Sequence, residues 1–403
     1  MVKRNVNSNA LAAHWHPDTI AVRGGTMRSE FGETSEALFL NSGFCYDSAE
    51  VAESRFNGEA PGYVYSRYLN PTLHMLEQRL ALMEAAPACC VMGSGMAAVF
   101  ASLMSHLKAG DHVIAHRVLF GSCHYILAEI CPRFGIEVTF IDGTQPDAWK
   151  GAFRDNTRCV FIETPANPTL DIIDIAHVAS LTRAHGVMLI VDNILAGTSV
   201  QRPFAFGADV VVYSTTKHMD GQGRTLGGAV LGSKQFIEEV VTPFHRHTGP
   251  ALSPFNAWVI LKSLETYGLR IARHCDNALA IARACEAHPA IARITYPHLP
   301  SHPGHKVATA QMSRGGNMIA MEIAGGKEAA FRFMNALELI DISNNLGDSK
   351  SLITHPATTT HANMDAEARR AIHITDGLVR LSVGLEHADD LIADITQALE
   401  MSS

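Results

Sequence analysis

The sequence predicts an α/β fold, with a mostly parallel central sheet covered by helices on both faces and a smaller C-terminal α+β domain. Short apolar segments of strand length alternate with segments of helical periodicity through the middle of the chain. A long helical stretch follows, and the remaining residues contain few strands and a terminal helix. With 403 residues, 47% of them hydrophobic and 18% charged, the chain is long enough for two or three domains.

The first core element is a helix beginning at Asn70-Pro71-Thr72, because Pro71 sets up a turn and apolar residues follow at helical spacing. Apolar runs then predict strands at Ala88–Met92, His112–Ala115, Glu137–Ile141, Arg158–Glu163, Val187–Asp192 and Asp209–Tyr213. Helical periodicity predicts helices at Met96–Leu107, Gly121–Phe134 and Ile175–His185, and a long helical stretch over Pro254–Ala287. The last predicted strands lie near Asn317–Ile323 and Leu378–Val383.

Three parts are expected along the chain. Residues 1–69 are weakly periodic and end in a glycine-rich segment, which predicts an extended N-terminal arm. Residues 70–268 contain the alternating strands and helices and predict the large α/β domain. Residues 269–403 predict the C-terminal α+β domain.

Composition excludes several classes of function. The net charge of −8 argues against nucleic acid or an anionic membrane as the main partner, since both favour a basic surface. No apolar run approaches the roughly 20 residues of a membrane-spanning helix, and Lys3 and Arg4 precede polar residues and not an apolar signal core. Eight cysteines without Cys-x-x-Cys spacing indicate reduced, mostly buried thiols, so a cytoplasmic location is expected.

Small residues follow the first predicted strand. Gly93–Ala98 leads into a helix, and a helix N-terminus behind small residues can offer backbone N–H groups to a phosphate. A plain tight turn explains the segment equally well. The segment also matches the dinucleotide pattern Gly-x-Gly-x-x-Ala, but the next strand ends in His116-Arg117, with no acid placed for a ribose.

Polar residues end three further strands of the predicted sheet, and ligands of such sheets bind at the carboxyl ends of the strands. Asp192 closes an apolar strand, where a partly desolvated acid needs a positive partner. Ser214-Thr215-Thr216 offers hydroxyl groups and is followed by Lys217, while Asn167 lies in a proline-flanked loop. Each feature alone could be a structural turn or a surface residue. Together, the phosphate cradle, acid, hydroxyls and lysine predict pyridoxal 5′-phosphate as the cofactor.

Several motifs follow one another in the order of a known enzyme family: Tyr63-Val64-Tyr65-Ser66-Arg67 with Asn70-Pro71-Thr72, Gly93-Ser94-Gly95-Met96-Ala97, Glu163-Thr164-Pro165-Ala166-Asn167-Pro168, Val191-Asp192-Asn193, Ser214-Thr215-Thr216-Lys217, Ser351-Leu352-Ile353-Thr354-His355-Pro356 and Val379-Arg380-Leu381-Ser382-Val383-Gly384. From about Tyr63 to Glu386 the chain resembles the Cys/Met-metabolism, or cystathionine γ-synthase-like, family of pyridoxal-phosphate enzymes. The resemblance implies the aspartate-aminotransferase-like fold type I of pyridoxal-phosphate-dependent transferases. It also implies a homotetramer built from two active dimers.

The resemblance implies a role for each matching residue. Lys217 would carry the cofactor as a Schiff base and shuttle protons, and Asp192 would pair with the pyridine nitrogen. The phosphate would be bound by the backbone of Gly95 and Met96, the hydroxyls of Ser214 and Thr216, and Tyr65 and Arg67 from the neighbouring subunit. Asn167 would lie near the 3′-oxygen or the substrate, and Arg380 would bind the α-carboxylate of an amino acid.

Three segments depart from the usual family pattern. Phe120 stands where the family usually has a tyrosine that stacks on the cofactor ring, so it can stack but cannot transfer a proton. Asn345 precedes Leu-Gly where many members have serine, and Asp220-Gly221-Gln222-Gly223-Arg224 follows the lysine. These segments look most like the O-succinylhomoserine sulfhydrylase branch, which joins sulfide to an activated homoserine ester and yields homocysteine. Arg224 and Arg55 are candidates for binding the succinyl carboxylate.

Alternatives remain within and outside this chemistry. A cystathionine γ-synthase would use cysteine as the nucleophile, and a γ- or β-lyase would eliminate without replacement. A nicotinamide-dependent oxidoreductase would use Gly93–Ala98 but leaves Lys217 and Asp192 unexplained, and a non-catalytic binding protein leaves the whole set unexplained. No metal site is expected, because the histidine groups lack a cysteine or acid at a usual spacing; these groups are His245 with His247, and His298 with His302 and His305. His355 and His361 are predicted to be structural.

Overall fold

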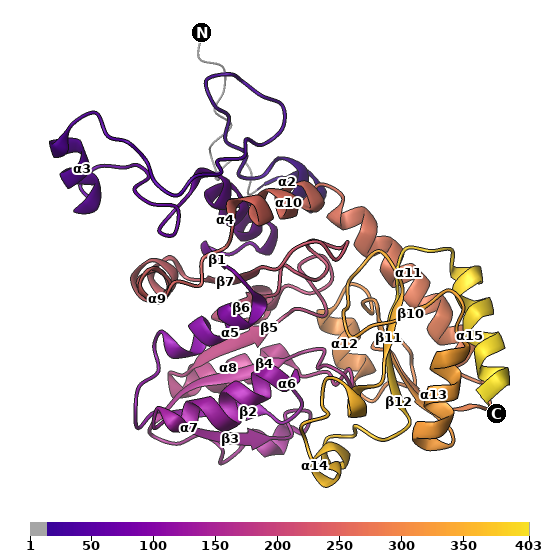
Figure 1. Ribbon diagram of the computed structural model, residues 1–403. Coiled ribbons are helices and arrows are strands. Elements are labelled where there is room, and N and C mark those ends of the chain that lie inside the picture. The colour runs from indigo at the N-terminus through magenta and orange to yellow at the C-terminus, as the bar shows by residue number, and fades with distance from the viewer. Residues whose placement is uncertain (1–13, 403) are drawn as a thin grey trace. The chain divides into compact units, whose positions relative to one another are not determined.

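The computed structural model describes residues 14–402 (Figure 1). Seven strands form a mixed sheet in the order β1-β7-β6-β5-β4-β2-β3, and five form a second sheet in the order β10-β11-β12-β9-β8. The chain divides into two compact units: unit 1 runs through His106 and includes Val212–Asp220 and Arg224–Gly268, and unit 2 consists of Leu107–Val211, Gly221–Gly223 and Leu269 onward. The expectation about a signal segment and the first residues of the predicted arm fall on residues 1–13, outside the described part.

Unit 1 is built around helices and an antiparallel strand pair. Its elements are α2 (Pro17–Arg23), α3 (Ala49–Phe56), α4 (Pro71–Glu84), β1 (Ala88–Met92), α5 (Gly95–Met104), β7 (Gly228–Gly232), the π-helix η4 (Phe236–Val241), α9 (Thr242–Thr248) and α10 (Pro254–Leu264). The Asn70 side chain accepts a hydrogen bond from Thr72 N–H at 2.9 Å, which caps α4 at the predicted start. Strand β1 pairs antiparallel with β7. The predicted arm contains α2 and α3, and Figure 1 shows α3 extending away from α4.

Unit 2 contains the parallel strands β2 (His112–His116), β3 (Glu137–Ile141), β4 (Thr157–Glu163) and β5 (Met188–Asp192). Between them lie α6 (Gly121–Tyr125), the π-helix η1 (Ile126–Ile130), α7 (Cys131–Arg133), the 3-10 helices η2 (Pro146–Trp149) and η3 (Pro203–Phe206), and α8 (Ile175–His185). Strand β6 (Val210–Tyr213) and helix α11 (Tyr267–Cys285) each have residues in both units. The predicted parallel arrangement is therefore confirmed for the four strands of this unit.

The second sheet of unit 2 carries the C-terminal core. Its strands are β8 (Ile291–Thr295), β9 (Met318–Ile323), β10 (Asp341–Ile342), β11 (Leu352–Thr354) and β12 (Leu378–Ser382). Its helices are α12 (His305–Gln311), α13 (Gly326–Ala336), the 3-10 helix η5 (Pro356–Thr358), α14 (Ala366–Ala371) and α15 (Ala388–Ser402). Buried residues such as Phe333 of α13, Leu391 of α15 and Leu381 of β12 form one apolar cluster, which holds the strand bearing Arg380 in place.

The structure differs from the predicted elements in several places. The helical stretch predicted at Pro254–Ala287 is two helices, α10 and α11, and η1 interrupts the helix predicted at Gly121–Phe134. Strands β7, β8, β10 and β11 were not predicted. Strand β7 begins and ends with glycine, and a Cβ at Gly228 would lie 2.1 Å from the carbonyl oxygen of Ser94. The glycine is therefore required by the close packing of two backbones, and the strand lacks the apolar alternation that would predict it.

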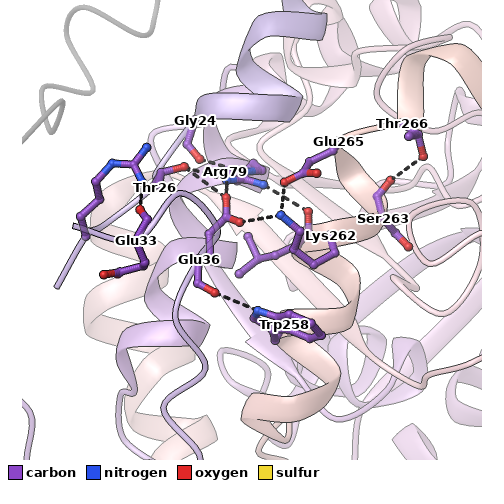
Figure 2. Close-up of polar contacts among 12 residues, drawn as sticks. Gly24, Thr26, Glu33, Glu36, Arg79, Trp258, Lys262, Ser263, Glu265 and Thr266 are labelled. Carbon is purple, nitrogen blue, oxygen red and sulfur yellow. Dashed lines mark hydrogen bonds and ion pairs between the residues drawn. The ribbon is translucent and has the colours of Figure 1, made fainter. Parts of the chain in front are cut away.

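A buried ion network within unit 1 joins the arm to helices α4 and α10 (Figure 2). Glu36 of the arm pairs with Arg79 of α4, whose side chain is fully buried, and accepts a hydrogen bond from Lys262 of α10 at 3.1 Å. Arg79 also donates to the backbone oxygen of Gly24 at 2.8 Å and of Leu261 at 3.1 Å. Because the arginine is satisfied on several sides, the pair can offset the cost of removing its charges from water.

We expect Glu36→Gln to destabilise unit 1 by about 3–5 kcal/mol near neutral pH, because it leaves Arg79 buried without its counter-charge. Burial alone would raise the pKa of Glu36, but the charge of Arg79 and hydrogen bonds from Arg79 and Lys262 outweigh burial and lower this pKa to about 2. A carboxyl whose pKa is lowered on folding stabilises the fold above its unfolded pKa and loses that effect as pH falls. The difference in unfolding free energy between wild type and variant should therefore shrink from about pH 5 towards pH 2 in urea titrations.

Glu265→Gln is the matched control, because Glu265 pairs with the same Lys262 but both side chains are about one-third exposed. Its cost should stay below about 1 kcal/mol. Equal destabilisation by the two variants, or a Glu36 effect independent of pH, would contradict the role of the buried pair.

No helix in residues 14–402 combines the length and apolarity needed to cross a membrane. All eight cysteines are free, and seven of them are buried.

Candidate active site

The predicted phosphate cradle lies in unit 1 at the start of α5. Ser94 caps the helix by accepting a hydrogen bond from Ala97 N–H at 3.1 Å. A Cβ on Gly95 would lie 2.5 Å from the Cβ of Ser214 and 2.8 Å from its hydroxyl oxygen, so only glycine allows this approach. The structure thus brings two predicted phosphate-binding groups, the backbone at Gly95–Met96 and the Ser214 hydroxyl, to one helix N-terminus.

The segment that follows β6 forms a tight turn carrying the predicted lysine. Lys217 N–H donates to the carbonyl oxygen of Ser214 at 3.2 Å. The Thr216 hydroxyl accepts from Gly227 N–H at 3.0 Å and donates to the Gly227 carbonyl at 3.2 Å, which secures the turn to the residue before β7. The buried hydroxyl of Thr215 has no hydrogen-bond partner among the described residues. The backbone of Lys217 is therefore well supported.

Arg224 lies after the same turn, and its guanidinium is already engaged. Its Nε and Nη2 donate to Oδ1 of the buried Asp220 at 3.0 and 2.9 Å, and Nη2 also donates to the hydroxyl of Ser263. The Arg224 N–H donates to Asp220 Oδ2 at 2.6 Å. This ion pair makes Arg224 less available to a substrate carboxylate.

The three predicted site residues of the arm, Tyr65, Arg67 and Arg55, have aromatic contacts. The guanidinium of Arg67 lies 5.2 Å from the ring centroid of Tyr65 and 4.9 Å from that of Tyr68. Tyr65 and Arg67 line a surface pocket of about 350 Å³ in unit 1. Arg55 of α3 lies 5.5 Å from the ring centroid of Tyr46.

Unit 2 places two acids at the ends of neighbouring parallel strands. Asp192 ends β5, Glu163 ends β4, and the two residues are paired in register. Both are buried, with 1% and 2% of their surface exposed. Burial raises the pKa of Asp192 to about 7, although Ile194 N–H donates to its Oδ1 at 3.1 Å. A carboxyl in this position is strongly stabilised by a positive partner.

Arg380 of β12 contacts two other predicted site residues of unit 2, Asn167 and Asn345. Its Nη1 donates to the side-chain oxygen of Asn167 at 2.9 Å, and its Nη2 donates to the backbone oxygens of Asn344 at 2.9 Å and Asn345 at 3.3 Å. Arg380 is buried, and its Nε has no hydrogen-bond partner among residues 14–402. Burial lowers its pKa to about 10, while the charge of Glu163 opposes this effect. A buried donor of this kind suits a ligand carboxylate.

Phe120 lies directly before α6, and its N–H donates to Glu163 Oε2 at 2.7 Å. We expect Phe120→Leu to weaken ring stacking on the cofactor by about 1 kcal/mol, or about fivefold in cofactor affinity, with modest loss of activity. Titration of the apo-protein with pyridoxal 5′-phosphate would measure this effect. Phe134→Leu, at an exposed position of unit 2, is the control. A loss of activity as severe as that of a Lys217 variant, with cofactor still bound, would contradict a stacking role.

The histidines predicted to be structural are hydrogen-bonded within unit 2. His355 contacts the Thr358 hydroxyl at 2.9 Å and the Asp376 carbonyl at 2.8 Å, and His361 contacts Thr360 and the Leu119 carbonyl. His302 contacts the Leu170 carbonyl at 3.0 Å. In the described part of the chain, no group of three or more His, Cys, Asp or Glu residues is placed to hold a metal ion.

The predicted site residues belong to both compact units. Those in unit 1 are Tyr65, Arg67, Gly95, Met96, Ser214, Thr216, Lys217, Arg224 and Arg55; those in unit 2 are Phe120, Asn167, Asp192, Asn345 and Arg380. Sequence reasoning gave no role to Glu163, although its motif was recognised. The sequence pattern that identified Asp192 as a site residue is also present at Glu163, because both acids end an apolar strand.

The family model for the Cys/Met metabolism PLP-dependent enzymes matches residues 18–400. The chain belongs to this family. An O-succinylhomoserine sulfhydrylase of Mycobacterium tuberculosis (strain H37Rv) is 51% identical over 385 residues, covering 94% of this chain and 95% of the relative. An L-methionine gamma-lyase of Fusobacterium nucleatum subsp. polymorphum is 41% identical over 384 residues, covering 95% and 97% of the two chains.

A solved structure is similar over nearly the whole chain as well. The crystal structure of a putative O-acetylhomoserine (thiol)-lyase of Campylobacter jejuni, with a TM-score of 0.92 and 31% identity, covers 96% of this chain and 100% of that one. It contains N′-pyridoxyl-lysine-5′-monophosphate. These findings confirm the predicted family, the fold type I architecture and pyridoxal 5′-phosphate as the cofactor.

The residues of this family member suit the cofactor chemically. Burial raises the pKa of Asp192, and a positive partner such as a protonated ring nitrogen would stabilise its ionised form. The close approach of Gly95 to Ser214 leaves backbone N–H groups and a hydroxyl at one helix start, as a phosphate requires. Unit 2 therefore provides an acid that suits the ring nitrogen of pyridoxal 5′-phosphate, and unit 1 provides groups that suit its phosphate.

Proposed function

We propose that the chain is an O-succinylhomoserine sulfhydrylase, which converts O-succinylhomoserine and sulfide into homocysteine and succinate in methionine biosynthesis. The observation that carries this proposal is the 51% identity with the M. tuberculosis relative of that name, extending over 94% of the chain. Arg380 supports an amino-acid substrate, because its guanidinium is buried and its Nε has no hydrogen-bond partner within residues 14–402, which suits an α-carboxylate.

Each residue has a distinct role in this proposal. Bound pyridoxal 5′-phosphate supplies an electron sink for the carbon that loses a proton. Asp192 holds a proton on the ring nitrogen, and Gly95, Met96, Ser214 and Thr216 bind the phosphate. Lys217 holds the cofactor, and its Nζ removes the substrate α-proton and returns protons in the later steps. Arg380 and Asn167 orient the α-carboxylate, with Asn345 beside them.

Phe120 favours an ester over a thioether as the substrate. A departing succinate is a weak base, since carboxyl groups have a pKa near 4, and it leaves without protonation. A departing thiolate is far more basic, as the thiol pKa of about 8.5 indicates, and benefits from a nearby acid. Phenylalanine supplies no such acid. This argument favours γ-replacement on an activated ester over the γ-lyase reaction that the F. nucleatum relative suggests.

Product analysis tests the function. The purified holoenzyme would be offered O-succinylhomoserine or O-acetylhomoserine, each with sulfide or cysteine, and L-methionine in a separate reaction. We expect homocysteine and succinate as the dominant products. Faster formation of cystathionine would identify a cystathionine γ-synthase, and release of methanethiol from methionine as the fastest reaction would identify a lyase.

The succinyl group carries a carboxylate that the acetyl group lacks, so a preference for the succinyl ester requires a cationic side chain in the substrate site. We expect Arg55→Ala or Arg224→Ala to lower kcat/KM for O-succinylhomoserine about ten- to a hundredfold while leaving O-acetylhomoserine nearly unchanged. Arg55 is the stronger candidate, because Arg224 is paired with Asp220. Arg28→Ala in the same arm is the control, since Arg28 is exposed and donates to the Glu33 carbonyl. Equal losses with both esters would remove these arginines from succinyl recognition.

A cytoplasmic homotetramer, built from two active dimers, completes the proposal. Large apolar side chains are exposed on unit 1 at Phe31, Leu40, Phe56, Leu226 and Phe255, as expected of a surface that a second copy covers. Mixing inactive Arg67→Ala and inactive Lys217→Ala subunits should restore activity if Arg67 serves the neighbour's site. Verified hybrid dimers without activity would contradict shared sites.

A further inference from the structure

Glu163 is a buried acid that contacts two segments of the proposed site at once. Its Oε2 accepts a hydrogen bond from Phe120 N–H at 2.7 Å, and its Oε1 accepts one from Asn167 N–H at 2.9 Å. Phe120 and Asn167 lie in loops that follow different strands, β2 and β4. One carboxyl group therefore sets the distance between these two loops.

Both loops carry side chains with proposed contacts to cofactor or substrate. Phe120 is the proposed stacking residue, and no side chain caps the helix that it begins. The Asn167 side-chain oxygen accepts from Arg380 Nη1 at 2.9 Å, so a shift of the Asn167 backbone would move the only side-chain acceptor for that arginine's Nη1 among the described residues. Burial raises the pKa of Glu163 and the charge of Asp192 raises it further, while the two backbone donors and Arg380 oppose this rise.

We propose that Glu163 is a positioning residue, which holds the ring-stacking group Phe120 and the carboxylate-binding pair Asn167–Arg380 in register through two backbone hydrogen bonds. The inference rests on the proposed roles of Phe120 and Arg380. It does not depend on which ester or which nucleophile the enzyme uses.

Two variants separate the components of this contact. In Glu163→Gln the side chain keeps its reach, but its NH₂ group cannot accept a hydrogen bond, so one of the two N–H groups loses its partner. Glu163→Asp keeps the acid but is one carbon–carbon bond, about 1.5 Å, too short to reach both N–H groups. Asp394→Asn is the matched control, because Asp394 is a buried acid that accepts from the N–H groups of Glu338, Leu339 and Ile340 outside the proposed site.

Two binding measurements that need no turnover provide the test. The first is the Kd of the apo-protein for pyridoxal 5′-phosphate. The second is spectral titration of the holoenzyme with L-norvaline, which has no leaving group, and with n-butylamine, which is norvaline without its carboxylate. We expect both Glu163 variants to weaken norvaline binding about ten- to a hundredfold, with butylamine within about threefold of wild type. Cofactor affinity should fall about fivefold.

The control variant Asp394→Asn should lower Tm without changing either affinity. The proposal is overturned if both Glu163 variants bind norvaline and cofactor like wild type while losing stability as the control does. It is also overturned if norvaline and butylamine weaken equally, since the Arg380 contact would then be unaffected. If Glu163→Gln fails to fold, Glu163→Asp alone decides between these outcomes. Neither affinity depends on O-succinylhomoserine or sulfide, so failure of the proposed reaction would be recognised separately.

Discussion

Lys217→Ala should abolish turnover, by about a thousand- to ten-thousandfold or more, while the protein remains folded. The proposed role of Lys217 combines a covalent bond to the cofactor with proton transfer, and loss of a positioned acid–base group alone costs about 10²–10⁴ in rate. The substitution keeps the hydrogen bonds that secure the turn, which are the Lys217 N–H bond to the Ser214 carbonyl and the bonds of the Thr216 hydroxyl with the Gly227 backbone. Steady-state kinetics with circular dichroism would check both expectations.

Borohydride reduction provides the direct measurement of attachment. Peptide mass analysis of the reduced wild-type holoenzyme should find the cofactor on Lys217. Lys234→Ala is the control, because Lys234 is an exposed lysine of unit 1 that pairs with the exposed Glu238 at 3.8 Å. Cofactor on any other lysine, or full activity in the Lys217 variant, would refute the assignment.

Arg380→Lys should lower kcat/KM for amino-acid substrates about ten- to a hundredfold, mainly by raising KM. Lysine keeps a positive charge but lacks the planar fork that binds a carboxylate in a two-pronged manner. The arginine also contacts Asn167 and the Asn344 carbonyl at the same time, which a single ammonium group cannot reproduce. Kinetics over a range of substrate concentrations would separate the KM effect from kcat.

The KM of the Arg380→Lys variant should depend on pH, and it should rise at alkaline pH. Burial already lowers the pKa of Arg380 to about 10, and it lowers the pKa of an amine in the same place as well. Lysine would therefore lose its charge at a lower pH than arginine, so the variant's KM should rise at alkaline pH before that of wild type. Arg293→Lys, at an exposed position of β8 in the same sheet, is the control and should behave like wild type.

The sequence predicted the parallel strands of unit 2 well, because each is a short apolar run bounded by turn residues. Strand Glu137–Ile141 and helix Ile175–His185 have the predicted bounds. Strand β7 was missed, because Gly228 is selected by its contact with the Ser94 backbone and such a contact leaves no periodic signal. The break between α10 and α11 was also missed, since both helices continue the same apolar periodicity.

Residue types and strand ends were enough to identify Asp192 and Lys217 as candidates. The contacts that hold the site residues could not be predicted from residue types or strand ends. The Arg224–Asp220 pair depends on how the chain turns after Lys217, and the Asn167–Arg380 hydrogen bond joins residues 213 positions apart. Glu163 closes an apolar strand as Asp192 does, but its role was overlooked because its two partners are backbone N–H groups, which no residue type reveals.

The arm network of Figure 2 has a consequence for the order of events during synthesis. Glu36 is made early, yet its partner Lys262 lies 226 positions later, and Arg79 reaches the carbonyl of Leu261 across 182 positions. The arm therefore cannot be fully fastened until α10 has left the ribosome. Until then Arg67 also lacks the Arg246 carbonyl to which it donates a hydrogen bond. Under the proposed sharing of active sites, a subunit can therefore serve a neighbour only after most of its own chain is complete.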